Sequence, residues 1–157
     1  MLAVSDTSTL CYLILIKQIH LLPQLYQQVC IPTAVYQELR TSGTPESVKT
    51  WIAALPDWLF VQSVALSPEQ DLALLDVGER EAIALAEHLQ ADVILLDERR
   101  GRTLATARGL RVVGLLGVLG AAAELDLADF STAISCLQTT NFWVSPKLLK
   151  RLLEHYS

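Results

Sequence analysis

The sequence predicts an α/β domain with a central parallel sheet covered by helices on both faces, a three-layer α/β/α arrangement. Short runs of aliphatic and β-branched residues alternate along the chain with longer segments whose apolar residues recur at helical spacing. The clearest of the short runs are apolar throughout, which is typical of strands buried on both faces of a parallel sheet. A length of 157 residues, 52% of them hydrophobic, suits one domain over residues 1–157.

The first third of the chain shows the order β-α-β-α. A short apolar run ends at Asp6, where a strand would pass into a densely apolar helix. A β-branched stretch then leads to Pro32, which suits the first turn of a helix because an amide proton there has no partner within the helix. The expected strands span residues 2–4 and 29–31, and the expected helices span 9–16, 21–28 and 33–40.

The middle of the chain repeats this alternation. Turn-forming residues separate the third helix from a fourth. Apolar residues at helical spacing then precede a fully apolar strand that stops at Asp97. The expected elements are a helix to about residue 54 after the turn at 41–45, a strand over 59–64, a helix over 78–90 and a strand over 93–96.

The last third contains one more strand and mostly helices. Gly109 follows a short helical segment and is expected as its C-cap. The expected elements are a strand over 111–113 and helices over 103–108, 115–124, 130–139 and 145–155.

Composition and charge restrict the classes of protein. The longest uncharged apolar run, residues 112–123, is shorter than the roughly 20 residues that cross a bilayer, and Asp6 interrupts any signal peptide. We therefore expect a cytoplasmic protein without a membrane association. Three widely spaced cysteines in apolar surroundings predict buried, reduced thiols. A net charge of −5 opposes indiscriminate binding to polyanions, so any contact with nucleic acid should be local.

Four acidic residues are candidates for a single site at one edge of the sheet. Asp6 and Asp97 each follow an expected strand, and the carboxyl ends of parallel strands meet at the same edge. Glu79 opens an amphipathic helix on the side of its apolar stripe, so its carboxylate should point inward. Glu38 lies near the apolar edge of its own helix, an unusual place for a solvated glutamate.

Clustered carboxylates need a compensating charge. Two carboxylates about 4 Å apart repel each other by roughly 4 kcal/mol at an effective dielectric constant near 20, and oxygen-rich sites suit Mg²⁺ or Mn²⁺. Each residue alone also has an ordinary alternative. Asp6 and Asp97 could be helix N-caps, residues 76–79 a capping box, and Glu38 a surface residue. Only the combination favours a functional site.

Four segments of the chain resemble the PIN-domain family. Val4-Ser5-Asp6-Thr7-Ser8 is similar to the opening of that domain, and residues 31–39 are similar to its second acidic motif. Residues 76–86 and 94–102 resemble a poorly characterised, toxin-like (VapC-related) branch of the family. The order and spacing agree from residue 2 to about 120, whereas the helices after residue 124 match only loosely.

The resemblance implies a PIN-like fold and a metal-dependent endoribonuclease. Its metal-binding and catalytic acids would be Asp6, Glu38, Glu79 and Asp97, holding Mg²⁺ or Mn²⁺. Ser8 is a further candidate ligand, and Glu98 competes with Asp97 because that branch often has a second aspartate there. The implied substrate is RNA, and the implied partners are a second copy of the chain in a homodimer and an antitoxin protein.

A dense group of arginines follows the last acidic motif directly. These residues could grip RNA phosphates, or they could be solvated charges on a loop and a short helix. The candidates for RNA binding are Arg99, Arg100 and Arg102.

Two rival functions are weighed against the nuclease. A PIN-like scaffold could be a non-catalytic protein-interaction module, since a fold does not guarantee chemistry. A nucleotide-binding domain is suggested by the glycines at 114, 117 and 120, but their spacing does not match a dinucleotide site and no P-loop lysine is present.

Overall fold

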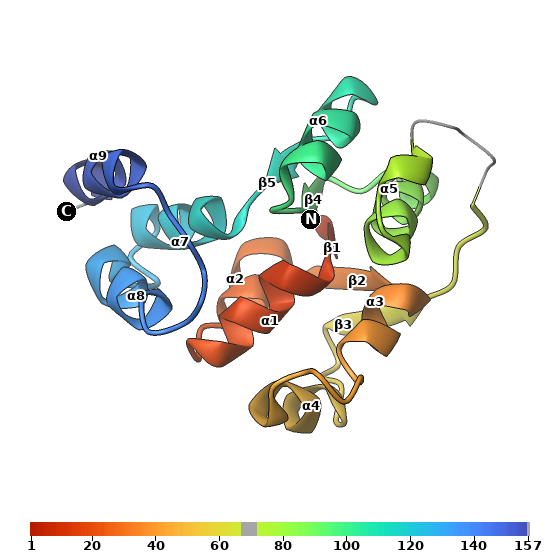
Figure 1. Ribbon diagram of the computed structural model, residues 1–157, viewed down its shortest axis with the longest axis horizontal. Helices are drawn as coiled ribbons and strands as arrows, with labels where there is room; N and C mark the ends of the chain where they lie inside the picture. Colours follow the sequence, from red (N-terminus) through yellow and green to blue (C-terminus); the bar gives the residue numbers. More distant parts are fainter. Residues whose placement is uncertain (67–71, 157) are drawn as a thin grey trace.

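The fold is built on a five-stranded, all-parallel sheet, seen edge-on among its helices in Figure 1. The structure is a computed structural model that describes residues 1–66 and 72–156. The strand order is β3-β2-β1-β4-β5, so the first strand of the chain lies at the centre. The strands are β1 (Leu2–Ser5), β2 (Gln28–Pro32), β3 (Leu59–Gln62), β4 (Val93–Leu95) and β5 (Val112–Val113).

Helices follow the strands in the predicted alternation. The first group is α1 (Thr7–Leu15), α2 (Leu21–Tyr26), α3 (Thr33–Glu38), α4 (Glu46–Ile52) and α5 (Val77–Leu89), with a short 3₁₀ turn η1 (Leu72–Leu74) before α5. The second group is α6 (Arg99–Ala107), α7 (Leu115–Glu124), α8 (Phe130–Leu137) and α9 (Pro146–Tyr156).

The two faces of the sheet bury two separate hydrophobic cores. Side chains alternate along each strand, so in β1 Ala3 faces one core and Val4 the other. The core on the Ala3 side is filled by residues of α1, α2, α3, α4, α7 and α8, and the core on the Val4 side by residues of α5 and α6. Helices therefore cover both faces, which confirms the predicted three-layer α/β/α fold.

Helix α6 begins earlier than the sequence analysis expects, at Arg99 rather than at residue 103. Glu98 caps it, because its carboxylate accepts a hydrogen bond from the amide of Gly101 at 2.7 Å. A glycine early in a helix weakens the local signal, but here its backbone approaches Leu96 so closely that an added Cβ would lie 3.2 Å from that side chain. The arginines of this region therefore lie on a helix. Gly109 follows it with a φ of +83°, as expected of a helix C-cap glycine.

The last three helices form a lobe at one end of the molecule, shown in blue in Figure 1. Tyr156 of α9 lies 4.7 Å from Phe130 of α8, measured between ring centroids. The same ring contacts the backbone of α7 at Gly120, where an added Cβ would collide with it. No stretch of helix among the described residues combines the length and the hydropathy that a membrane span requires.

The expectation for the cysteines is correct only in part. All three thiols are free. Cys30 is buried, Cys11 is half-buried and Cys136 is exposed on α8, so burial holds for only one of them. The exposure of Cys136 follows from its position on α8 outside the buried stripe of that helix, which is formed by Phe130, Ala133, Ile134 and Leu137.

Candidate active site

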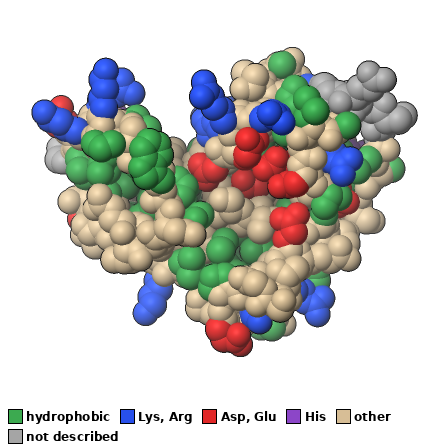
Figure 2. Space-filling view, viewed as in Figure 1, with side chains coloured by type: hydrophobic (Ala, Val, Ile, Leu, Met, Phe, Trp, Pro, Cys, Tyr) green, Lys and Arg blue, Asp and Glu red, His purple; other side chains and the backbone are tan. Residues whose placement is uncertain are grey.

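A cavity of about 640 Å³ opens at the carboxyl edge of the sheet. All four acids predicted for the site line it, and each comes from a different part of the chain. Figure 2 shows acidic side chains gathered in a hollow at the centre of this face, with Lys and Arg side chains along its upper rim. The four predicted residues are Asp6, Glu38, Glu79 and Asp97, and Asp76 and Glu98 line the same cavity.

Asp6 lies where β1 passes into α1. One carboxylate oxygen accepts a hydrogen bond from the amide of Thr9 at 2.9 Å, so Asp6 is the N-cap of α1. The other oxygen accepts from the amide of Asp97 at 3.1 Å, which ties the ends of two neighbouring strands together. The residue is only 4% exposed, and burial raises its pKa to about 6. Asp6 is therefore both the N-cap of α1 and an acid that lines the cavity, so the two roles do not exclude each other.

Asp97 follows β4 and has a similar double role. Its carboxylate accepts from the amide of Leu115 at the start of α7, with oxygen distances of 3.0 and 3.2 Å. The buried hydroxyl of Thr9 donates to it at 3.1 Å. Burial raises the pKa of Asp97, while these hydrogen bonds and the nearby Arg102 partly oppose the rise.

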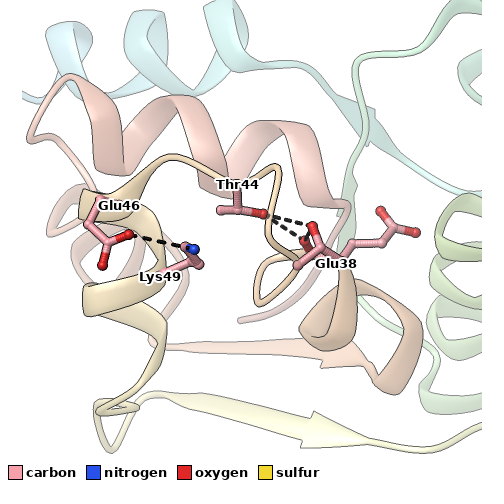
Figure 3. A network of polar contacts seen from close by, with 5 residues as sticks. Glu38, Thr44, Glu46 and Lys49 are labelled. Atoms are coloured by element: carbon pink, nitrogen blue, oxygen red, sulfur yellow. Dashed lines mark hydrogen bonds and ion pairs between the residues drawn. The ribbon is translucent and has the colours of Figure 1, made fainter.

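Glu38 reaches the cavity from the C-terminal end of α3. The hydroxyl of Thr7 donates to its carboxylate at 2.5 Å, and the carboxylate lies so close to Gly78 that any Cβ there would collide with it. Burial raises the pKa of Glu38, with a smaller contribution from Asp76, whereas bonds from Thr7 and from the amide of Gly78 lower it. In Figure 3 the carboxylate points away from Thr44, whose hydroxyl donates to the carbonyl of Glu38 at 2.9 Å.

Helices α3 and α5 each provide a glutamate carboxylate that accepts a hydrogen bond from the first turn of the other helix. Glu38 of α3 accepts from the amide of Gly78 in the first turn of α5. In return, Glu81 of α5 accepts from the amide of Ala34 in the first turn of α3 at 3.0 Å. Pro32, the N-cap of α3, makes no side-chain capping bond, so Glu81 supplies the missing acceptor. This exchange fixes the position of Glu38 relative to α5.

Glu79 lies in the first turn of α5. Its amide donates to the carboxylate of Asp76, the N-cap, at 2.9 Å, which is the first half of the predicted capping box. Its own carboxylate lines the cavity. Burial and, to a smaller extent, the negative charges of Asp76, Glu98 and Asp6 raise the pKa of Glu79 to about 7. The carboxylate of Glu79 therefore interacts electrostatically with other acids of the cavity.

The donor set fits a hard divalent cation. Carboxylate oxygens are the ligands that Mg²⁺ and Mn²⁺ prefer, and burial raises the pKa of Asp6, Glu79 and Asp97, so a bound cation would stabilise their charged forms. Within residues 1–66 and 72–156, no three His, Cys, Asp or Glu side chains stand close enough together to form a finished metal site. The acids surround a shared space and would have to move towards an ion.

The remaining predicted site residues lie around this cavity. Ser8 lines it from the first turn of α1, and Glu98 lines it while capping α6. Arg99 and Arg100 are exposed on α6, where they border a separate shallow hollow together with Glu98. Arg102 donates from its guanidinium to the carbonyl of Leu96 at 3.0 Å, so part of its donor capacity is used within the fold.

The sequence analysis missed several residues of the cavity wall. Tyr12 and Asn141 line it and are hydrogen-bonded to each other across 129 positions. Neither belongs to an acidic motif, and a contact over that separation leaves no local pattern in the sequence. The role of Glu81 was missed for the same reason, because its partner Ala34 lies on another helix.

Comparisons with known proteins agree with this architecture. The family model DUF3368, described as a PIN domain, matches residues 2–157. Among solved structures, a PilT N-terminus domain protein from the hyperthermophilic archaeon Sulfolobus solfataricus is similar in fold, with a TM-score of 0.58 and 18% sequence identity. The similarity covers 78% of this chain and 93% of that one. A search of curated protein sequences gave no match.

PIN domains are in general nucleases that act on RNA and use divalent metal ions. The match over residues 2–157 includes the last helices, for which the sequence alone gave only a loose resemblance. The chain belongs to the PIN-domain family.

Proposed function

We propose that the protein is an endoribonuclease that hydrolyses RNA phosphodiesters with Mg²⁺ or Mn²⁺. The observation that carries this proposal is the convergence of Asp6, Glu38, Glu79 and Asp97 on one cavity. All four have raised pKa values, with burial as the main cause. Such a cluster is unfavourable in the empty protein and becomes favourable with a cation, as in metal-assisted hydrolysis.

The way in which each acid is held in the fold would determine its role in binding the metal ion. Asp6 and Asp97, held by backbone amides, would be the direct ligands, and Glu38 and Glu79 would hold the ion through water or directly. A bound ion would supply a more acidic water and stabilise the negative charge of the leaving oxygen. The hydroxyl of Ser8 and the exposed Arg99 and Arg100 would orient phosphate oxygens of the RNA.

The biological role that fits best is the toxin of a toxin–antitoxin pair, acting as a single domain and as a homodimer. Residues 76–86 and 94–102, which resemble a toxin-like branch of the family, support this part of the proposal. Expression of the chain in bacteria should arrest growth, and the Asp6→Asn variant should not. Arrest by both forms would contradict a nuclease toxin.

Calorimetric titration with Mn²⁺ tests the site without knowledge of the RNA. We expect binding by the wild type and a loss of at least tenfold in affinity for Asp6→Asn and Asp97→Asn. Asp57→Asn removes an exposed carboxylate outside the cavity and is the matched control. Retention of wild-type affinity by both cavity variants would contradict the proposal.

A non-catalytic interaction module is the second candidate. The observation in its favour is that the acids of the described chain are not already arranged as a metal site. If wild type binds neither Mn²⁺ nor Mg²⁺ in the presence of RNA, this candidate replaces the nuclease, because a PIN fold can persist without its chemistry.

A further inference from the structure

The cavity extends beyond its carboxylates to a wall contributed by the end of the chain. Asn141, in the segment between α8 and α9, lines the same cavity as the acids at the strand ends. The hydroxyl of Tyr12 on α1 donates to the side-chain oxygen of Asn141 at 2.5 Å. This bond fixes the carboxamide and leaves its NH₂ group, a pair of donors, without a partner in the part of the chain that the structure describes.

Two aromatic residues follow Asn141 directly in the chain, outside the lining of the cavity. Tyr12 meets Phe142 edge to face, with ring centroids 5.1 Å apart and an interplanar angle of 75°. The next residue, Trp143, is 78% exposed, the largest exposed fraction among the large hydrophobic side chains of the described chain. Phe142 and Trp143 also border a small hollow of about 240 Å³. An indole this exposed contributes little to folding, and its ring faces are open to a ligand.

We propose that Tyr12, Asn141 and Trp143 form a nucleobase-binding ledge for single-stranded RNA beside the carboxylates. The inference rests on the proposed function, because it requires an RNA phosphodiester at the acids. A nucleotide next to that phosphodiester would meet the wall that shares the cavity. Unpaired bases stack on aromatic side chains, and a carboxamide bonds to the edge of a base. Bases inside a duplex are stacked already and cannot reach such a wall.

Electrostatics adds a reason for such a ledge. The net charge is −5 and the cavity itself is acidic, so phosphate neutralisation alone cannot provide strong RNA binding. Arg99 and Arg100 are exposed on α6, whose cap Glu98 lines the cavity, and they border a separate hollow where they offer phosphate contacts. Stacking and contacts to base edges would add to the affinity that the arginines and a bound cation provide. A volume of about 640 Å³ lies within the range of about 300–1,000 Å³ usual for ligand pockets, so it can hold more than a phosphate.

The test is RNA affinity measured with the full chain. Fluorescence anisotropy of labelled single-stranded oligonucleotides of A, C or U is followed with Ca²⁺ in place of Mn²⁺ to prevent cleavage. Trp143→Ala should weaken binding about tenfold, the usual effect of removing one stacking platform, and Trp143→Phe should restore most of it. Phe60→Ala, which removes another exposed aromatic at the far edge of the sheet, is the matched control and should bind as wild type.

Two further readouts are specific to the ledge. Tryptophan emission of the wild type should change on RNA addition, and that of Trp143→Phe should not, because the remaining Trp51 and Trp58 pack against each other with centroids 5.9 Å apart. Asn141→Ala should alter the preference among the A, C and U oligonucleotides while the Mn²⁺ affinity stays unchanged.

The outcomes separate the ledge from the nuclease. If wild type binds Mn²⁺ and cleaves RNA, but Trp143→Ala and Asn141→Ala bind RNA like wild type, the ledge is overturned and the nuclease stands. If Mn²⁺ does not bind, the nuclease fails, and RNA affinities in metal-free buffer still test the ledge. Equal affinity for duplex and single-stranded RNA, or no RNA binding by wild type, also overturns the ledge.

Discussion

The acidic cavity has two halves that are held in different ways. In the strand-end half, Asp6 and Asp97 follow β1 and β4 and accept hydrogen bonds from backbone amides at the starts of α1 and α7, so their positions follow from the sheet itself. In the helix half, Glu38 and Glu79 come from α3 and α5, whose relative position depends on the carboxylates that these helices exchange. The strand-end half should therefore be rigid and the helix half adjustable, and a metal ion would draw the helix half inwards.

The largest expected effect separates the two halves by activity. Asp6→Asn should reduce Mn²⁺-dependent RNA cleavage by at least a hundredfold, about 3 kcal/mol in the activation barrier, because a direct ligand is lost. Glu79→Gln should cost about tenfold, because a water-mediated contact can be replaced by the amide oxygen. Cleavage rates at saturating Mn²⁺ give the comparison. Equal losses in the two variants would show that the halves do not differ.

The second effect is a dependence of stability on pH in the metal-free protein. The pKa of Asp6 is about 6 when folded and near 3.8 in an unfolded chain, so the folded state holds the proton more tightly. The resulting stability is complete below about pH 4 and is lost as the pH rises through 6, and Glu79, with a pKa of about 7, extends the loss towards neutrality.

Urea unfolding in a chelating buffer measures this loss. Between pH 5 and pH 8 the free energy of unfolding should fall by on the order of 2 kcal/mol, and Mn²⁺ should restore it. Asp6→Asn keeps a capping side chain and should flatten the profile. A stability that rises over this range in the wild type would contradict the burial of an uncompensated acid.

The third prediction concerns the stability of the helix half alone. Glu81→Ala removes the acceptor for the amide of Ala34 and should cost about 1 kcal/mol of stability, the usual loss for a helix cap. Thermal unfolding measures this loss, and Glu81→Gln, which keeps an acceptor oxygen, is the control. A destabilisation as large in Glu81→Gln as in Glu81→Ala would show that the capping bond is not the cause.

The smallest effect concerns the support behind Glu38, shown in Figure 3. Thr44→Val removes one hydroxyl donor to the carbonyl of Glu38, but the hydroxyl of Thr41 also donates to it at 2.9 Å. The carbonyl stays satisfied, so the loss should be about 0.5 kcal/mol in urea unfolding. The nearby Glu46–Lys49 ion pair, 3.5 Å long and largely exposed at Glu46, is the reference, and Glu46→Gln should change stability less. A larger loss in Glu46→Gln would reverse this ranking.

The halves also differ in how well the sequence predicts them. The fold class and the placement of Asp6 and Asp97 follow from apolar runs that end at an acid, since parallel strands bring their ends together. Glu38 was predicted from its position near an apolar edge, but its contact with Gly78 joins two helices far apart in the chain. The start of α6 was misplaced because Gly101 looks unfavourable locally, whereas its role is to approach Leu96. Long-range packing of this kind has no short sequence signature.

The central place of β1 in the sheet has a consequence for how the protein is made. Asp6 and Asp97 are 91 positions apart, and β1 leaves one edge unpaired until β4 has been synthesised. Pairing over such a separation is a slow step of folding, because a long loop must close before the contact forms. A ribosome translating this chain therefore holds a nascent N-terminal half that has no strand-end pair of carboxylates. The proposed metal site therefore cannot form until the polypeptide has extended past Asp97.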